Sequence, residues 1–288
     1  MSSVHIVTDS TADIPSWLAR KLNITVMPLK VIFGNEAYRD GLDISLEEFY
    51  SRLKSEPAST SQPSPGEFIE TYKPIIEQGQ SIVSIHISSL LSGTVQSAQL
   101  AKATLGNADI EIIDSRLTSM ALGIVVLAAA QTAQNGQNKE QVLALVRFML
   151  EHIGVYFLVD TLDYLQRGGR IGKAQAFLGS LLNIKPILEL RDGIVSPVEK
   201  ARGRKRGLER LVELTRKSLP ATEIPPGFII VHGNIPEVAA DLDTMVAECF
   251  GHGSYLIGSV GAVIGTHTGP GVVALIYYPD CLSAQIFN

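Results

Sequence analysis

The chain has 288 residues and a net charge of −5, and 45% of its residues are apolar while only 18% are charged. Two domains with well-supplied apolar cores are predicted for a chain of this length. The acidic balance argues against nucleic acid as the main partner, because phosphate binding needs an excess of Lys and Arg.

The cysteines and the apolar runs bear on location. Cys249 and Cys281 lie far apart and outside any C-x-x-C motif, which favours the reducing cytoplasm over a disulfide framework or a cysteine-ligated zinc site. The first residues lack the basic and apolar parts of a signal peptide. The longest apolar run, residues 120–130, is shorter than the ~20 residues of a membrane span, so we expect a helix buried on every side.

In the first half, strand-like and helical runs alternate, which is typical of an α/β protein with a largely parallel sheet. Strands are expected over residues 4–7, 24–33, 81–87 and 110–113. Helices are expected from residue 16, over 46–54, from 65, from 94, and over 119–134 and 139–152. Ser45 and Ser64 each precede a Glu by three residues, which predicts a capping box at two of these helix starts.

The second half continues the alternation. We expect a strand over residues 155–159, a turn at Gly168-Gly169 and a helix over 175–182. Asp192-Gly193 predicts a hairpin between strands 186–190 and 194–198. A basic helix over 204–218, a strand over 227–231, a helix over 236–250 and strands over 254–260 and 272–278 are expected to complete the chain.

Three expected loops are rich in hydroxyl residues, Gly and Pro and contain no Lys, Arg, Asp or Glu: residues 60–65 (TSQPSP), 88–94 (SSLLSGT) and 265–271 (GTHTGPG). If they meet in space, they form a pocket of neutral hydrogen-bond donors. A helix N-terminus offers about half a positive charge, which suits a carboxylate better than a doubly charged phosphate. Apolar side chains beside such a pocket could line a channel for an apolar tail.

Nucleotide and metal motifs are not found. Residues 168–174 (GGRIGKA) superficially resemble a phosphate loop, but three residues separate the glycines and Ala174 follows Lys173. A Walker A loop needs four residues there and Ser or Thr after the Lys. No G-x-G-x-x-G opens a helix after the first strand, and the six histidines show no H-E-x-x-H spacing. The sequence therefore predicts no metal site and no cofactor.

Ser92 has three interpretations. The position of Ser92 fits a helix N-cap, a contact to an anion, or a nucleophile that acts with His267 and an aspartate such as Asp9 or Asp114. Capping and anion binding are compatible, because the same N–H groups serve both. The chain has no G-x-S-x-G motif, which counts against the nucleophile. A serine-dependent esterase or thioesterase that uses Ser92 and His267 is the alternative function.

An ordered set of motifs, from residue 4 to about residue 278, resembles the DegV family. The motifs are residues 8–15 (TDSTADIP), 60–65, 92–94 (SGT), 114–115 (DS), 167–171 (RGGRI) and 265–271. The resemblance implies an α/β protein of two domains with a ligand at their interface. We expect an N-terminal, Rossmann-like domain with a parallel sheet over residues 1–153, and a C-terminal α/β domain with a mixed sheet over 154–288.

The resemblance also implies a function. It is that of a bacterial carrier without catalytic activity of its own, which holds one long-chain fatty acid such as palmitate, stearate or oleate. Such a carrier presents the acid to a separate fatty acid kinase subunit, which makes the acyl phosphate and supplies the nucleotide site. The role belongs to fatty acid metabolism and phospholipid synthesis. Whether the lipid is cargo or only a signal stays open.

The site residues follow from the matching motifs. Contacts to the ligand are implied for Thr60, Ser61, Ser92, Gly93, Thr94, His267 and Thr268. Docking of the kinase or its phosphate is implied for Arg170, Arg202 and His267. The basic run at residues 200–206 fits an acidic partner from its charge alone, although a solvated helix start explains any single member equally well.

Overall fold

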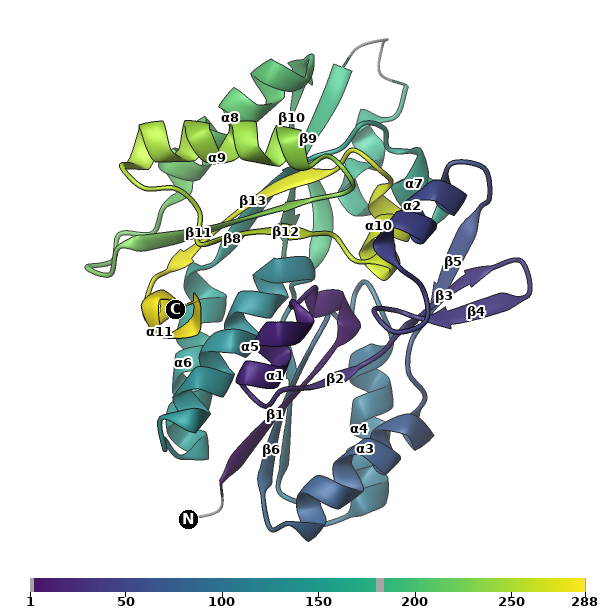
Figure 1. Cartoon of the computed structure of the whole chain (residues 1–288), viewed down its shortest axis with the longest axis vertical. Helices are drawn as coiled ribbons and strands as arrows, with labels where there is room; N and C mark the ends of the chain where they lie inside the picture. The colour runs from purple at the N-terminus through teal and green to yellow at the C-terminus, as the bar shows by residue number, and fades with distance from the viewer. Residues whose placement is uncertain (1–2, 180–183, 288) are drawn as a thin grey trace.

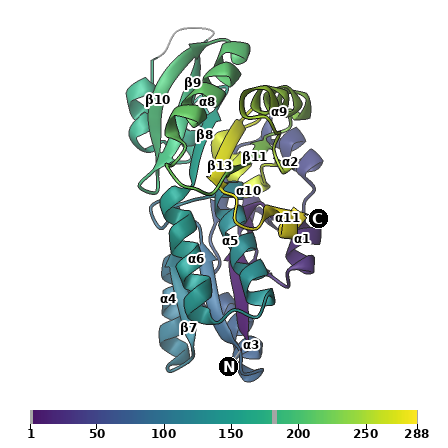
Figure 2. The same cartoon turned by 90° about the vertical axis from the view of Figure 1, so that its left-hand side faces the viewer.

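The computed structural model describes residues 3–179 and 184–287. A four-stranded parallel sheet and a six-stranded mixed sheet lie one beyond the other along the long axis, and a three-stranded antiparallel sheet lies beside them (Figures 1 and 2). This arrangement confirms the α/β fold with one parallel and one mixed sheet. In the described residues, no helix is long and apolar enough to cross a membrane.

Helices cover both faces of the parallel sheet. In sheet order its strands are β2 (Thr25–Met27), β1 (Val4–Asp9), β6 (Ser81–His86) and β7 (Ile110–Asp114). Helices α3 (Pro65–Glu77) and α4 (Thr94–Leu105) pack on one face. The other face is covered by α1 (Ser16–Lys21), α5 (Ser119–Gln134) and α6 (Lys139–His152). Helix α5 is buried from Met120 to Ala130, as its uniform hydrophobicity predicts.

The carboxyl ends of β1 and β6 form a topological switch point, because the sheet continues from β1 to β2 on one side and to β6 on the other. Ligands of open α/β sheets bind at such a point. Asp9 ties the two strand ends together: its carboxylate accepts hydrogen bonds from Nδ1 of His86 at 2.9 Å and from the N–H of Ile87 at 3.0 Å. The segment that carries Ser92 starts directly after this tie.

The two faces of the mixed sheet pack against different parts of the molecule. In sheet order its strands are β10 (Ile194–Arg202), β9 (Ile184–Arg191), β8 (Gly154–Leu158), β13 (Val273–Pro279), β11 (Pro226–His232) and β12 (Leu256–Ser259). Side chains alternate between the two faces of a strand. In β13, Val273 and Leu275 pack under α8 (Arg204–Ser218) and α9 (Pro236–Phe250), whereas Ala274 and Ile276 belong to the larger core shared with the first half.

Several elements differ from the sequence-based expectation. The extended run over residues 24–33 divides between two sheets, as β2 and as β3 (Lys30–Phe33). Strand β3 pairs with β4 (Glu36–Arg39) and β5 (Ala58–Ser61), so Thr60 and Ser61 end a strand instead of opening a loop. The third expected loop is largely helical, because α10 spans Ala262–Thr268. Also unexpected are α11 (Ser283–Phe287), which packs against α5, and η1 (Ser10–Ala12).

Other expectations are confirmed or corrected locally. Helix α2 (Leu46–Leu53) begins after Ser45, and the full capping box of Ser64 and Glu67 opens α3. Positive φ angles of 53° at Asp192 and 83° at Gly193 fit the predicted hairpin turn. The helix expected over residues 175–182 is wrong at its start, where a 3₁₀ helix, η2, spans Gly172–Phe177 after the short helix α7 (Asp163–Arg167); residues 180–182 lie outside the described residues.

Candidate ligand cavity

A cavity of about 330 Å³ opens between the carboxyl ends of the parallel strands and the inner face of the mixed sheet. This volume falls within the ~300–1,000 Å³ of small-molecule sites. Its apolar lining consists of Leu29, Ile87, Leu91, Val155, Phe157, Leu165, Leu190, Val195, Val231, Val260, Val263, Ile264, Val272, Ala274 and Ile276. Its polar lining consists of Thr60, Ser61, Gln62, Ser92, Thr118, Ser119, Arg170, His267 and Thr268.

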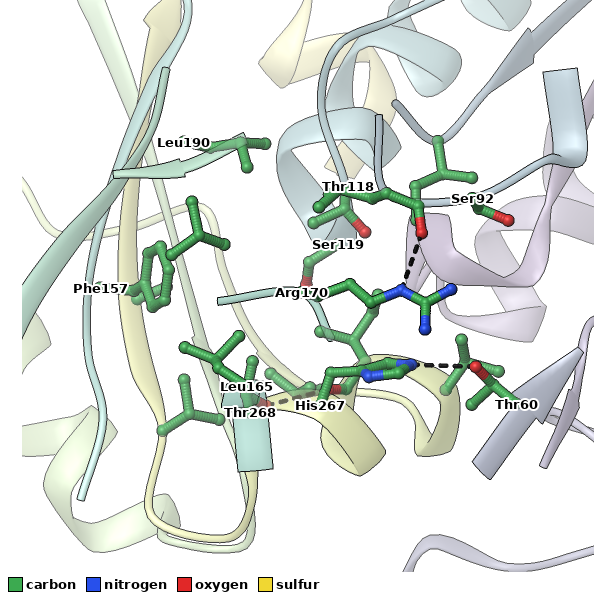
Figure 3. A pocket seen from close by; sticks show the side chains of 18 of the residues that line it. Thr60, Ser92, Thr118, Ser119, Phe157, Leu165, Arg170, Leu190, His267 and Thr268 are labelled. Atoms are coloured by element: carbon green, nitrogen blue, oxygen red, sulfur yellow. Dashed lines mark hydrogen bonds between the residues drawn. The ribbon is translucent and has the colours of Figure 1, made fainter. Parts of the chain in front are cut away.

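The polar and apolar side chains are segregated. Figure 3 shows Ser92, Thr60 and His267 at one end with the guanidinium of Arg170 between them, while Phe157 and Leu190 stand at the other end. The described strands of the mixed sheet supply much of the apolar wall, and β5, α10 and the segment before α4 supply most of the polar end. The cavity is therefore amphipathic along its length.

Thr60 and His267 join β5 to α10 across the polar end. Oγ1 of Thr60 and Nε2 of His267 are hydrogen-bonded at 2.9 Å. Nδ1 of His267 is buried without a partner among the described residues and faces Gly168, where any Cβ would overlap the imidazole ring. Thr268, the last residue of α10, donates its hydroxyl to the backbone oxygen of Ile264 at 3.0 Å. Its oxygen remains able to accept a hydrogen bond.

Two buried carboxyls hold the start of α10 and so fix the position of His267. Asp13 accepts from the N–H of Gly261 and Asp40 from the N–H of Ala262, each at 3.1 Å. Asp13 also accepts the hydroxyl of Ser119, a cavity residue, at 2.5 Å. Burial is the main cause that raises the pKa of both carboxyls, that of Asp40 to about 6.

His267 is uncharged at neutral pH. Its burial, with the nearby positive charge of Arg170 as a second cause, lowers the pKa of the imidazole to about 4. A neutral imidazole has one N–H donor and one acceptor nitrogen. Near neutral pH the positive charge at this end of the cavity therefore comes from Arg170 and not from His267.

Arg170 makes the polar end less neutral than the three hydroxyl-rich segments suggest. Its Nε donates to the backbone oxygen of Leu91 at 3.1 Å, and its Nη1 to that of Gly168 at 2.6 Å. Its Nη2 has no partner among the described residues. Two fixed N–H groups hold the guanidinium in place, so the third nitrogen can meet an anion in the cavity. Arg170, expected at a docking surface, thus also lines the cavity.

The three residues at the start of α4 do not share one position. Ser92 lines the cavity, whereas Gly93 and Thr94 are not among its lining residues. The hydroxyl of Ser92 is bonded to that of Thr94 at 2.9 Å and accepts weakly from the N–H of Thr94 at 3.4 Å. Gly93, not Ser92, is the N-cap residue. The hydroxyl of Ser92 thus stays at the surface of the cavity, available to a ligand.

The cavity does not pair Ser92 with His267 as its base: each is hydrogen-bonded to another described residue. Ser92 is hydrogen-bonded to Thr94, and Nε2 of His267 to Thr60. A serine nucleophile needs its base within hydrogen-bond distance. The hydrogen bonding of Ser92 and His267 therefore gives no specific support to the esterase alternative.

Arg202 is exposed at the end of β10 and does not line the cavity. Within the basic run, Arg204 is paired with Asp160, and Arg206 with glutamates of α8. Arg202 and Lys205 are exposed and make no ion pair with any described residue. The charge of the run that is free for a partner is therefore smaller than the sequence suggests.

Sequence reasoning missed Gln62 and Thr118. Gln62 lies within the TSQPSP motif and accepts the N–H of Gly93 at 3.1 Å, so its motif position was the available signal. Thr118 lines the cavity with a buried hydroxyl oxygen that has no partner in the described part of the chain. Nothing in the local pattern distinguishes it from an ordinary residue before a helix.

Fold and cavity together define an α/β ligand-binding protein whose buried apolar cavity ends in hydroxyls and one guanidinium. The chain belongs to the DegV family: residues 3–280 match the family described as "Uncharacterised protein, DegV family". It is 36% identical over 278 residues to protein DegV of Bacillus subtilis, covering 96% of this chain and 99% of that protein. It is 40% identical over 276 residues to a DegV domain-containing protein of Streptomyces coelicolor, covering 95% and 97%.

Solved structures of similar proteins have the same fold over nearly the whole chain. A DegV family protein from Thermus thermophilus, described by its fatty acid binding, aligns with a TM-score of 0.90 at 36% identity over 96% of this chain and 99% of that one. A stearic acid-binding protein from Eubacterium ventriosum aligns with a TM-score of 0.86 at 26% identity over 97% and 98%. DegV family structures from Bacillus subtilis and Streptococcus agalactiae are likewise described as fatty acid binding.

Proposed function

We propose that this protein binds one long-chain fatty acid, with the carboxylate at the polar end of the cavity and the acyl chain against the mixed sheet. The observation that carries the proposal is the amphipathic cavity itself: Arg170, Ser92 and Thr60 stand at one end, and most of the remaining lining is apolar. Each buried CH₂ group contributes ~0.8 kcal/mol, so the tail supplies most of the affinity and the polar end sets its orientation.

The head-group contacts follow from the donors at that end. Nη2 of Arg170 offers a charge-assisted hydrogen bond, and the hydroxyls of Ser92, Thr60 and Ser61 offer neutral ones. One cation and several neutral donors match a singly charged carboxylate. Thr268 and the neutral His267 complete the surroundings, and the backbone of Gly93 and Thr94 supports Ser92.

Calorimetric titration of the delipidated protein with palmitate, stearate and oleate tests the proposal, and a stoichiometry of one is expected. Ala274→Phe is the matched variant: Ala274 lines the cavity from β13 and is only 6% exposed, so a phenyl ring there occupies the space of the tail. This variant should stay folded and lose affinity by at least tenfold. Wild-type protein that binds none of the three acids would exclude the proposal.

We further propose that the bound acid is presented to a separate kinase subunit. There a carboxylate oxygen attacks the γ-phosphorus of ATP, which yields the acyl phosphate and ADP. This proposal is supported by the family membership, by exposed Arg202 and Lys205, and by the absence of any nucleotide motif from the sequence. In this account the carrier itself performs no catalysis.

The kinase role predicts that docking and lipid binding are separable. Arg202→Ala should leave the affinity for palmitate unchanged and slow acyl phosphate formation by the partner kinase, because a docking cation is lost. Arg216→Ala, an exposed cation near the other end of α8, serves as the control and should leave both unchanged. Equal rates for the two variants would exclude Arg202 from the docking surface.

A further inference from the structure

Gln62 bridges the two walls of the polar end. Its Oε1 accepts the N–H of Gly93 at 3.1 Å, and its Nε2 donates to the hydroxyl of Ser97 at 3.4 Å. The amide lies flat against Gly93, where a Cβ would overlap its oxygen, nitrogen and carbon atoms. In the described part of the chain, these are the hydrogen bonds that join residues 60–62 to residues 92–97.

The segment before Gln62 is tied to β3 and, through the hydrogen bond between Thr60 and His267, to α10. Thr60 pairs with Val31, and Ser61 with Lys30, in the β3–β5 ladder. After Gln62, the capping box of Ser64 anchors the start of α3. These ties hold residues 60–64, but none of them contacts the segment that carries Ser92.

We propose that Gln62 is a positioning residue, which sets the separation between the hydroxyls of β5 and Ser92 so that one carboxylate can contact both. This inference rests on the proposed fatty acid binding. The same geometry allows an opposite role, in which Oε1 of Gln62 occupies the N–H of Gly93 until the carboxylate displaces it. The two roles predict opposite effects of removing the Gln62 amide. If the amide positions the hydroxyls, its removal weakens palmitate binding, and if it competes with the carboxylate for the N–H of Gly93, its removal tightens binding.

Palmitate titration of delipidated variants distinguishes them. Gln62→Ala and Gly93→Ala should each weaken binding by about three- to tenfold, the range of a lost hydrogen bond. The affinity of the double variant for palmitate should equal that of the single variant with the lower affinity, because both changes remove one shared contact. Gln134→Ala is the control. It removes a hydrogen bond that the side-chain amide of Gln134 donates to the backbone oxygen of Lys21 on the exposed surface, and it should bind palmitate as the wild type does.

Gln62→Glu adds a readout that a merely structural role would not change. The substitution keeps the acceptor for Gly93 but places a negative charge beside the head group. It should weaken the binding of palmitate more than that of hexadecanol, whereas Gln62→Ala should affect both alike. An equal loss for the two ligands in Gln62→Glu would overturn the placement of Gln62 beside the carboxylate.

The remaining outcomes are decisive as well. Unchanged or tighter palmitate binding by Gln62→Ala, while the wild type binds, overturns the positioning role alone. A lower melting temperature with unchanged affinity does the same, since it would show that the bridge serves stability only. A wild-type protein that binds no palmitate overturns the proposed function and this role together.

Discussion

At the polar end of the cavity, individual side chains divide their tasks. Arg170 supplies the charge, held by its two bonds to the backbone oxygens of Leu91 and Gly168. His267 stays neutral and bonded to Thr60. Ser92 offers a hydroxyl that is hydrogen-bonded, within residues 3–179 and 184–287, to Thr94 alone. Under the proposed function these groups hold the carboxylate, and Ser92 and His267 are hydrogen-bonded to Thr94 and Thr60 and not to each other.

Removal of the Ser92 hydroxyl should weaken fatty acid binding. Ser92→Ala is expected to cost about 0.5–1.5 kcal/mol, or up to about 3 if the hydroxyl bonds the charged carboxylate, as measured by calorimetric titration with palmitate. Ser89→Ala is the matched control: Ser89 lies in the same segment but bonds Asp114 and does not line the cavity. Unchanged affinity of Ser92→Ala would remove Ser92 from the site.

His267 should make the apoprotein sensitive to acid. Its pKa is about 4 in the folded state against an ordinary 6.5, so between these values the unfolded chain binds more protons. The stability contributed by the neutral imidazole is complete above pH 6.5 and is lost as the pH falls toward 4, by about 3 kcal/mol.

His267→Gln tests this pH dependence, because glutamine cannot take up the proton. Urea unfolding at pH 7 and at pH 4.5 should show that the wild type loses stability relative to the variant at the lower pH. A difference between the two proteins that does not change with pH would contradict the pKa assignment.

The motifs made some site residues predictable and left others hidden. Thr60, Ser61, Ser92, His267 and Thr268 line one cavity, although some of them are more than two hundred residues apart in sequence. They could be predicted because each lies in a recognisable motif. Their direct contacts to a ligand remain a prediction. The turn at Gly168-Gly169 was predicted, but no local pattern shows that the turn directs Arg170 into the cavity.

Among the elements, α10 determines the geometry of the site. Its first N–H groups are held by Asp13 and Asp40 from the first half of the chain, and its last turn carries His267 and Thr268. Helix α10 is thus one of the elements that join the two halves. A substitution at the start of α10 should therefore displace His267 and Thr268 at its end.

Asp40→Asn isolates the contribution of this junction. The pKa of Asp40 is about 6 in the folded protein against an ordinary 3.8, so the folded state binds more protons between these values. Its stabilising contribution is complete below pH 3.8 and is lost as the pH rises through 6, by about 3 kcal/mol. Relative to the wild type, Asp40→Asn should therefore be more stable at pH 8 than at pH 4 in urea unfolding. The opposite trend would exclude a buried, protonated Asp40.

Elements with strong local signals were predictable from sequence, and elements defined by tertiary pairing were not. The capping box at Ser64 and the turn at Asp192-Gly193 specify their structures locally. Residues 265–268 contain two threonines and a glycine, which are poor helix formers, yet the tertiary contacts to Asp13 and Asp40 make them helical. Strands β4 and β5 are short and largely polar, so no periodicity marks them.

At the scale of the whole molecule, the cavity lies where the carboxyl ends of the parallel strands meet one face of the mixed sheet. The parallel sheet contributes its switch point and the mixed sheet contributes one apolar face. The parallel sheet uses strands before residue 153 and the mixed sheet strands after it, which is compatible with a boundary there. The division into domains 1–153 and 154–288 stays a prediction, since α11 packs back against α5.

Identification of the lipid in the purified protein tests the central claim most directly. The protein should be extracted with organic solvent and the extract examined by mass spectrometry, with Ala274→Phe treated in parallel. We predict about one equivalent of long-chain fatty acid from the wild type and much less from the variant. An extract without fatty acid, from a protein that also fails to bind added palmitate, stearate or oleate, would contradict the account.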